Sequence, residues 1–111
     1  MDSYFAIIAE PNRRAILSML LSSERSVNEI ERKLRLSQPS VSKHLRVLRH
    51  AGFVSSRVQA QQRLYSLRAE PLMELDAWLS PFREFWSRHV DALEVHLDNL
   101  EKQSRAKGKK R

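Results

Sequence analysis

The chain has 111 residues, 41% of them hydrophobic and 30% charged, with a formal net charge of +7. This length and composition predict one globular domain and exclude a largely disordered chain, while the positive charge favours a polyanionic partner. The absence of cysteine excludes disulfides and thiolate metal sites, and the apolar runs are too short for a membrane span or a signal-peptide core, so we expect a cytoplasmic protein.

Two short helices are predicted at the start of the chain. The first covers residues 3–9, and we expect three of its side chains to contribute to a dimer interface: Tyr4, Phe5 and Ile8. The second begins at Pro11, because proline suits the first turn of a helix. Arg13 and Arg14 lie on its rim, where they either contact a nucleic-acid phosphate or face solvent. Its core-facing residues are expected to be Ile16, Leu17, Leu20 and Leu21.

A capping box marks the start of a third helix. The Ser26 hydroxyl and the Glu29 carboxylate can each accept a hydrogen bond from the other residue's backbone N–H. The buried side of this helix is predicted from its apolar positions: Val27, Ile30 and Leu34. Only Arg35 and Leu36 separate it from a second cap at Ser37. The two helices therefore meet through a tight turn, which is the helix-turn-helix arrangement.

The fourth predicted helix covers residues 37–51. Pro39 is tolerated in its first turn, and Gly52 suits the left-handed residue just past its end. A buried stripe is predicted at i, i+4 and i+7: Val41, Leu45 and Leu48. The opposite side carries hydrogen-bond donors and no carboxylate: Lys43, Arg46 and His50. This pattern favours a DNA recognition helix.

Charge is distributed unevenly along the chain. No Asp or Glu occurs between Arg32 and Ala69, a stretch that contains nine Lys or Arg residues. A field of one sign attracts a polyanion and gains from the release of its counterions. Acidic residues outnumber basic ones in residues 71–102. We expect that segment to face away from nucleic acid.

A β-hairpin is predicted after Gly52, where the apolar pattern changes to a period near two. Its strands are expected at Val54–Val58 and Arg63–Leu67, joined by a turn that lacks Gly, Asn and Asp. Long polar side chains gather near the tip, where a wing can contact a minor groove or the DNA backbone: Arg57, Gln59, Gln61, Gln62 and Arg63.

The last part of the chain is predicted to contain one helix from Pro71 through Leu79 and another that restarts at Pro81. A heptad seam follows: Trp86, Val90, Leu93, Leu97 and Leu100. We expect this seam to form a homodimer. The alternatives are that it packs on its own chain, or that three aromatic residues line a small-ligand pocket: Phe82, Phe85 and Trp86. A basic, disordered tail is expected at residues 103–111, after one domain of residues 1–102.

Residues 5–68 resemble the ArsR-type (ArsR/SmtB-like) winged helix-turn-helix repressors. The resemblance rests on three blocks in a fixed order: residues 9–17 (AEPNRRAIL), residues 37–48 (SQPSVSKHLRVL) and AGFV at 51–54 leading to LYSL at 64–67. It implies a mostly α-helical, homodimeric fold with a small β-hairpin wing. It also implies an autoregulatory repressor that binds a palindromic operator and releases it when an effector binds. The wing departs from the family pattern, because Gly is common at the tip and this chain has QAQQ at 59–62.

The metal sites of that family are not matched here. In its best-known branch two cysteines flank a valine at the start of the first helix of the motif, and Ser26 and Asn28 stand at those positions. His89 and His96 are seven residues apart on the last helix, a rise of roughly 10 Å, which is too far for one ion within one chain. We therefore expect no metal and no cofactor, and the sequence does not identify an effector.

The expected DNA contacts fall into two groups. Base contacts are assigned to the start and outward face of the fourth helix: Gln38, Ser40, Ser42, Lys43 and His44. Backbone and wing contacts are assigned to Arg13, Arg46, Arg49, Arg57, Gln61, Gln62 and Arg63. Two alternatives stay open, a nucleoid-type architectural protein with little sequence preference and a winged-helix protein interaction module. The sequence has no glycine-rich phosphate loop and no nucleophile with a plausible histidine partner, so it does not indicate an enzyme.

Overall fold

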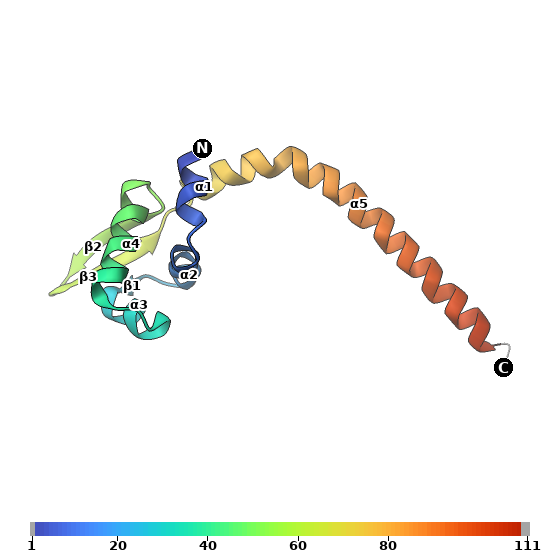
Figure 1. The fold of residues 1–111 in the computed structure, drawn as a ribbon, viewed down its shortest axis with the longest axis horizontal. Helices are drawn as coiled ribbons and strands as arrows, with labels where there is room; N and C mark the ends of the chain where they lie inside the picture. Colours follow the sequence, from blue (N-terminus) through green and yellow to red (C-terminus); the bar gives the residue numbers. More distant parts are fainter. Residues whose placement is uncertain (1, 110–111) are drawn as a thin grey trace. The chain divides into compact units, whose positions relative to one another are not determined.

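The computed structural model describes residues 2–109, with the backbone alone for residues 106–109. The elements follow in this order: α1 (Asp2–Ile8), α2 (Pro11–Met19), β1 (Arg25–Ser26), α3 (Val27–Leu34), α4 (Gln38–His50), β2 (Val54–Gln59), β3 (Gln62–Leu67) and α5 (Glu70–Lys109) (Figure 1). The chain divides into two compact units, with the boundary after Asp76. This mostly helical fold with a small hairpin confirms the predicted fold class.

The core of the first unit lies among α2, α3, α4 and the sheet. Its largest buried side chains are Ile16, Ile30, Val41, Leu45, Leu48, Phe53 and Val54. The predicted stripe of α4 is therefore confirmed. Leu21 was expected in the core but is 74% exposed. Because α2 ends at Met19 and Leu20 is its C-cap, the chain leaves the helix before Leu21 can continue the stripe.

Local signals set the ends of the two helices of the motif. At the start of α3, Ser26 and Glu29 form the predicted capping box. Arg35 then ends α3 in the left-handed region, with φ of 57°, and turns the chain toward the Ser37 cap of α4. These caps confirm the helix-turn-helix arrangement.

A Schellman motif ends α4. Gly52 has φ of +84°, and its N–H donates to the carbonyl of Arg49, at 3.1 Å. The N–H of Phe53 reaches back to the carbonyl of Leu48, at 2.9 Å, and both side chains are fully buried. After this motif the chain enters β2 directly, and β2 packs beside α4.

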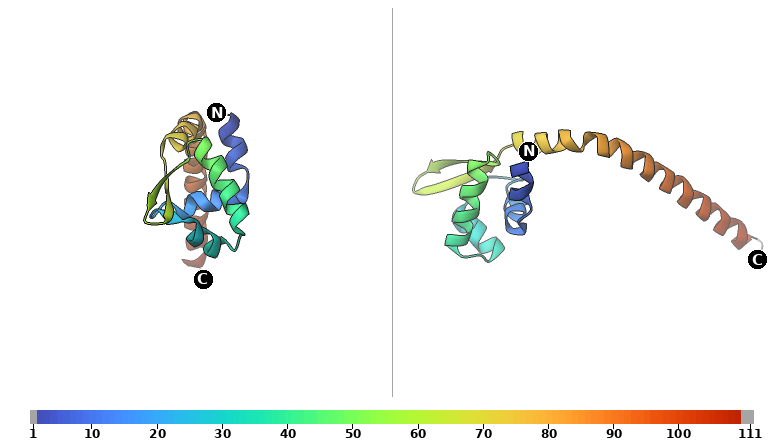
Figure 2. Two further views of the ribbon diagram at one scale, coloured as in Figure 1. Left: turned by 90° about the vertical axis from the view of Figure 1, so that its left-hand side faces the viewer. Right: turned by 45° about the horizontal axis from the view of Figure 1, so that its top comes forward.

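The sheet has the strand order β1-β3-β2, and all its pairs are antiparallel. The two predicted hairpin strands are confirmed, whereas β1, a pair of residues opposite Leu64 and Tyr65, was not predicted. Gln59 faces Gln62 across a two-residue turn, where Ala60 takes φ of 55°. The hairpin extends away from the helices as a wing (Figure 2).

The helix α1 covers part of the same core. The Tyr4 ring meets Phe53 edge-on, with ring centroids 5.4 Å apart, and the Tyr4 hydroxyl donates to the Glu74 carboxylate. This hydrogen bond, with partial desolvation, raises the pKa of Tyr4. Tyr4 and Ile8 are half-buried against their own chain, and Phe5 is 37% exposed.

The last helix is continuous where the sequence predicts two helices. Pro81 lies inside α5 instead of at a new start, so the predicted break is wrong. The proline removes one hydrogen bond to residue 77, and strong helix formers on both sides sustain the helix. The helix also continues through 103–109, where we expected a disordered tail, and Glu101 pairs with Arg105 at 2.7 Å. Residues 110–111 lie outside the described part of the chain.

Candidate nucleic-acid interface

The outward side of α4 is a row of exposed polar residues. Lys43, Arg46 and His50 are exposed, opposite the buried Val41 and Leu45. Because the helix repeats every 3.6 residues, the two sets lie on opposite faces. No carboxylate interrupts this side, since α4 contains neither Asp nor Glu. An α-helix with such a face has the dimensions and the donors to enter a major groove.

The first turn of α4 presents shorter polar groups. Gln38 is exposed, and Ser40 and Ser42 are half-buried. The Ser37 hydroxyl accepts a hydrogen bond from the backbone N–H of Ser40, at 3.4 Å. This cap fixes the direction in which the first turn leaves the tight turn after α3.

His44 of α4 lies beside residues at the start of α2. Its side chain is 12% exposed, and its Nδ1 accepts a hydrogen bond from Arg13 Nε, at 3.4 Å. Glu10 Oε2 lies 3.8 Å from its Nε2. His44 directly precedes the buried Leu45 and so lies on the flank of the stripe that faces α2. These contacts hold the imidazole of His44 beside α2, and the base contact assigned to it stays a prediction.

Arg13 and Arg14 are engaged at the end of α1. Arg13 Nη1 donates to the carbonyl of Ile7, at 3.2 Å. Arg14 Nη1 donates to the carbonyls of Ile8 and Ala9, at 2.7 and 3.0 Å. The last carbonyls of a helix have no partner within it, and these arginines supply one. Arg13 is thus placed as a cap of α1 and a partner of His44, which differs from the expected phosphate contact.

Arg57 on the wing is held by an acidic residue that the sequence did not single out. Its guanidinium donates to both carboxylate oxygens of Glu24, with the Nε bond at 3.1 Å. This pairing lowers the pKa of Glu24 and raises the pKa of Arg57. The expected phosphate contact of Arg57 would require this ion pair to open. The pair was missed because Glu24 and Arg57 are far apart in the sequence.

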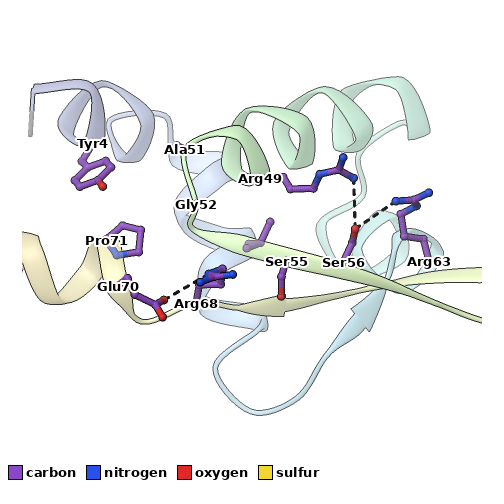
Figure 3. A pocket seen from close by; sticks show the side chains of 11 residues that line it. Tyr4, Arg49, Ala51, Gly52, Ser55, Ser56, Arg63, Arg68, Glu70 and Pro71 are labelled. Atoms are coloured by element: carbon purple, nitrogen blue, oxygen red, sulfur yellow. Dashed lines mark hydrogen bonds and ion pairs between the residues drawn. The ribbon is translucent and has the colours of Figure 1, made fainter.

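Two further arginines near the wing converge on one hydroxyl. Arg49 Nη1 and Arg63 Nη1 both donate to Ser56 Oγ, at 3.4 and 3.3 Å (Figure 3). They border a cavity of about 590 Å³, whose lining also includes Tyr4, Gly52, Arg68 and Glu70. Arg68 is paired with Glu70, at 3.5 Å. Ser56 was missed in the sequence, although its spacing of two from the buried Val54 places both on one face of the sheet.

The tip of the wing is exposed and polar. Gln59, Gln61 and Gln62 are all exposed, and the apolar Val58 beside them is 65% exposed. The tip therefore presents amide donors and acceptors together with one apolar side chain. Groups of this kind suit the degenerate donor and acceptor pattern of a minor groove.

The helix α5 carries an apolar row that its own unit leaves open. The five predicted seam residues are each at least 43% exposed: Trp86, Val90, Leu93, Leu97 and Leu100. Phe82 stacks at a tilt on Trp78, with ring centroids 4.8 Å apart, yet it is 46% exposed. These side chains are open, and a surface this apolar is typical of an interaction site.

The described residues contain neither a metal-binding cluster nor a membrane-spanning helix. No group of three or more His, Cys, Asp or Glu within residues 2–109 is arranged to hold a metal ion. His89 and His96 are both exposed on α5. In the same part of the chain, no helix is long and apolar enough to cross a membrane.

Comparisons with known proteins identify a family of bacterial regulatory proteins. Residues 10–56 match the model of bacterial regulatory proteins of the arsR family. The chain is 32% identical over 82 residues to the transcriptional repressor SdpR of Bacillus subtilis, covering 74% of this chain and 91% of SdpR. It is 45% identical over 60 residues to the transcriptional activator HlyU of Vibrio cholerae, covering 54% and 56%.

A solved structure agrees with these matches. The crystal structure of NolR from Sinorhizobium fredii superposes with a TM-score of 0.62 at 33% identity, over 73% of this chain and 81% of NolR. The matched part of the sequence, residues 10–56, includes both helices of the motif and the start of the wing.

Proposed function

Because the chain belongs to the ArsR family of bacterial transcriptional regulators, we propose that it binds a palindromic operator as a homodimer and represses transcription. As a member of this family it is a DNA-binding regulator and not an enzyme. The observation that carries the proposal is the exposed, acid-free face of α4 beside a basic wing. Such a surface attracts phosphate and can place donors against base edges.

We assign base readout to residues at the start and on the outward face of α4: Gln38, Ser40, Ser42 and Lys43. Lys43 can bind guanine O6 and N7, and Gln38 can make a bidentate contact with adenine. Arg46, Arg49 and Arg63 are proposed to contact the DNA backbone. Gln61 and Gln62 are proposed to reach the minor groove or the adjacent backbone from the tip of the wing. His44 and Arg13 are proposed to orient α4 on α2.

The dimer is proposed to form through the seam on α5. Five apolar residues at alternating spacings of four and three give the geometry of a coiled-coil contact. Their exposure in a single chain supports a second copy as the partner. A twofold dimer would then place two copies of α4 about 34–36 Å apart, one turn of DNA, and would require a palindromic site.

The direction of regulation is the finer part of the proposal. SdpR is named a repressor and HlyU an activator. We propose repression, because a small dimer that covers one operator needs no further surface to block the polymerase. A reporter gene placed behind the chain's own upstream DNA should lose expression when the regulator is supplied, and a gain would identify an activator.

The direct test is DNA affinity as a function of salt, measured with the chain's own upstream DNA and with a scrambled duplex of equal length. We expect a preference of about a thousandfold or more for the natural sequence. Lys43→Ala should reduce that preference, since a lost base contact relaxes specificity locally. Equal binding to both duplexes would contradict sequence-specific regulation and would favour an architectural protein.

A further inference from the structure

Two arginines from different elements point at the same serine on the first unit of the chain. Arg49 comes from the last turn of α4, and Arg63 from β3 of the wing. Each donates one hydrogen bond to Ser56 Oγ, at 3.4 and 3.3 Å (Figure 3). A hydroxyl oxygen has two lone pairs, and these two bonds occupy both of them. The hydrogen of the Ser56 hydroxyl remains available as a donor.

The register of the sheet explains this convergence. Val54 and Ser56 point to the same face of β2, and Val54 is buried against the core under α4. Arg63 lies opposite Val58, which belongs to that same face. The Schellman motif at Gly52 brings the last turn of α4 directly over the start of β2. The side chain of Arg49 therefore meets Ser56 from above, and Arg63 meets it from the neighbouring strand.

Arg49 and Arg63 differ from the other arginines nearby in their ion pairing. Among the described residues, no ion pair joins Arg49 or Arg63 to a carboxylate, whereas Arg57 is paired with Glu24 and Arg68 with Glu70. Two guanidinium groups that share one neutral acceptor repel each other. An anion placed between them would remove that repulsion and would gain charge-assisted hydrogen bonds.

We propose that Arg49, Arg63 and Ser56 form a site for a single phosphate group at the junction of α4 and the wing. The guanidinium fork matches the geometry of phosphate oxygens, and the serine hydroxyl supplies a further donor. The cavity of about 590 Å³ beside these residues gives a phosphate access from solvent. Shared by two elements, that phosphate would fix the wing and the recognition helix in one register on the DNA.

The inference rests on the proposed function, because the first source of the phosphate is the DNA backbone between the two elements. Free inorganic phosphate has the same chemistry and could occupy the site in the absence of DNA. The two sources of phosphate predict different binding behaviour. A backbone phosphate acts only in the complex, whereas free phosphate would compete with DNA at constant ionic strength.

The test uses a duplex selected for tight binding from a random pool, with each backbone phosphate replaced in turn by a neutral methylphosphonate. The proteins are the full-length wild type, Arg49→Gln, Arg63→Gln and the double variant. Arg68→Gln is the matched control, because it borders the same cavity but is already paired with Glu70. Unchanged circular dichroism and thermal midpoints verify that the variants are folded.

We expect one methylphosphonate position per half-site to weaken wild-type binding by about tenfold and to leave the double variant unaffected. Salt dependence provides a second readout. If both arginines neutralise one phosphate, the double variant loses about one unit of salt slope for each subunit, and each single variant loses less than half of what the double variant loses. Arg68→Gln should change neither readout.

Two results would overturn the inference. Additive losses, with about two units of slope lost per subunit, would mean that the arginines bind separate phosphates. No sensitive position would mean that they bind none. If the random pool yields no preferred sequence, the proposed function fails, and the same slopes measured on a mixed-sequence duplex still test the site. Weaker DNA binding in inorganic phosphate than in chloride, seen in the wild type and absent in the double variant, would add free phosphate as a second occupant.

Discussion

The helices α4 and α5 both carry an apolar stripe, but the stripe of α4 is buried within the first unit, whereas the seam of α5 from Trp86 to Leu100 is left exposed by its own unit. Leu45 and Leu48 of α4 are at most 1% exposed, whereas Leu93 and Leu97 of α5 are 47% and 60% exposed. Burying a leucine contributes about 1.5–3 kcal/mol, so the stripe of α4 stabilises the monomer. The stripe of α5 can contribute only when a second surface covers it. The first unit, which includes the first residues of α5, thus buries its own apolar side chains, and the seam of α5 stays exposed.

The two helices also differ in how their ends are set. A serine cap starts α4, and a left-handed glycine with two return hydrogen bonds ends it. No comparable stop interrupts α5, which continues through Pro81 to Lys109. Specific local signals therefore define the recognition helix, whose position must be fixed to about an ångström to read bases. The length of α5 follows from general helix propensity.

The largest expected effect comes from truncating one leucine in each stripe. Leu45→Ala should lower the free energy of unfolding by about 2–5 kcal/mol, because it leaves a cavity in a core with no exposed surface. Leu93→Ala should change the unfolding of the first unit by less than about 0.5 kcal/mol. Urea denaturation at several protein concentrations measures both effects.

Protein concentration distinguishes the two roles. The loss caused by Leu45→Ala should not depend on concentration, whereas any loss caused by Leu93→Ala should, because dimer dissociation is then linked to unfolding. Sedimentation of the Leu93→Ala variant should show more monomer than the wild type. Equal, concentration-independent losses would mean that α5 packs on its own chain and would end the contrast between the helices.

The second largest expected effect concerns Pro81, which does not end α5. Pro81→Ala should stabilise the helix by up to about 3 kcal/mol, because it restores the hydrogen bond to residue 77 and removes a steric clash. We expect stronger helical circular dichroism and slower amide exchange in residues 77–85. The unfolding of the first unit should change little. A loss of helical signal would show that the proline is needed where it stands.

Much of the first unit could be predicted because its signals are local. The capping box at Ser26 and Glu29, the serine cap of α4 and Gly52 all depend on residues within a few positions of each other. The stripe of α4 follows from helical periodicity alone. The hairpin strands were predicted from the alternation of apolar and polar residues, and their ends were correct to within one residue. The turn between them lacks the residues that usually mark a hairpin.

Pairings across the sequence could not be predicted. Glu24 meets Arg57 only after β1 pairs with β3, and a two-residue strand has no sequence signature. Helical periodicity places His44 on the flank of the stripe, but its contacts with Arg13 and Glu10 form only when distant parts of the sequence meet. Ser56 has a role only once α4 is placed above it. The sequence therefore predicted which surface of the protein is basic. The side chains that bind the arginines of that surface could be identified only from the structure.

A smaller effect tests whether local signals stabilise the first unit. The backbone N–H of Ser26, and then Arg25, hydrogen bond to Glu29 and hold the pKa of its carboxyl below its usual value. A group whose pKa is lowered by folding contributes stability above the unfolded pKa and loses it as pH falls through the folded one. Glu29→Gln should therefore cost about 0.5 kcal/mol at pH 7, a small value because solvent screens this carboxylate. The difference from the wild type should shrink as pH falls through the folded pKa, which urea titrations at pH 7 and at a series of lower pH values would show.

The smallest expected effect concerns the turn of the hairpin, where a residue other than glycine takes a positive φ. Ala60 has φ of 55°, which costs a residue with a side chain about 1–2 kcal/mol. Glycine removes that cost but gains about 0.4–1 kcal/mol of entropy in the unfolded chain. Ala60→Gly should therefore stabilise the hairpin by about 0.5 kcal/mol, measured by urea denaturation. Its DNA affinity should not fall, because Ala60 offers no polar side-chain group to DNA; a marked fall would show that this strained turn holds the tip of the wing in its binding conformation.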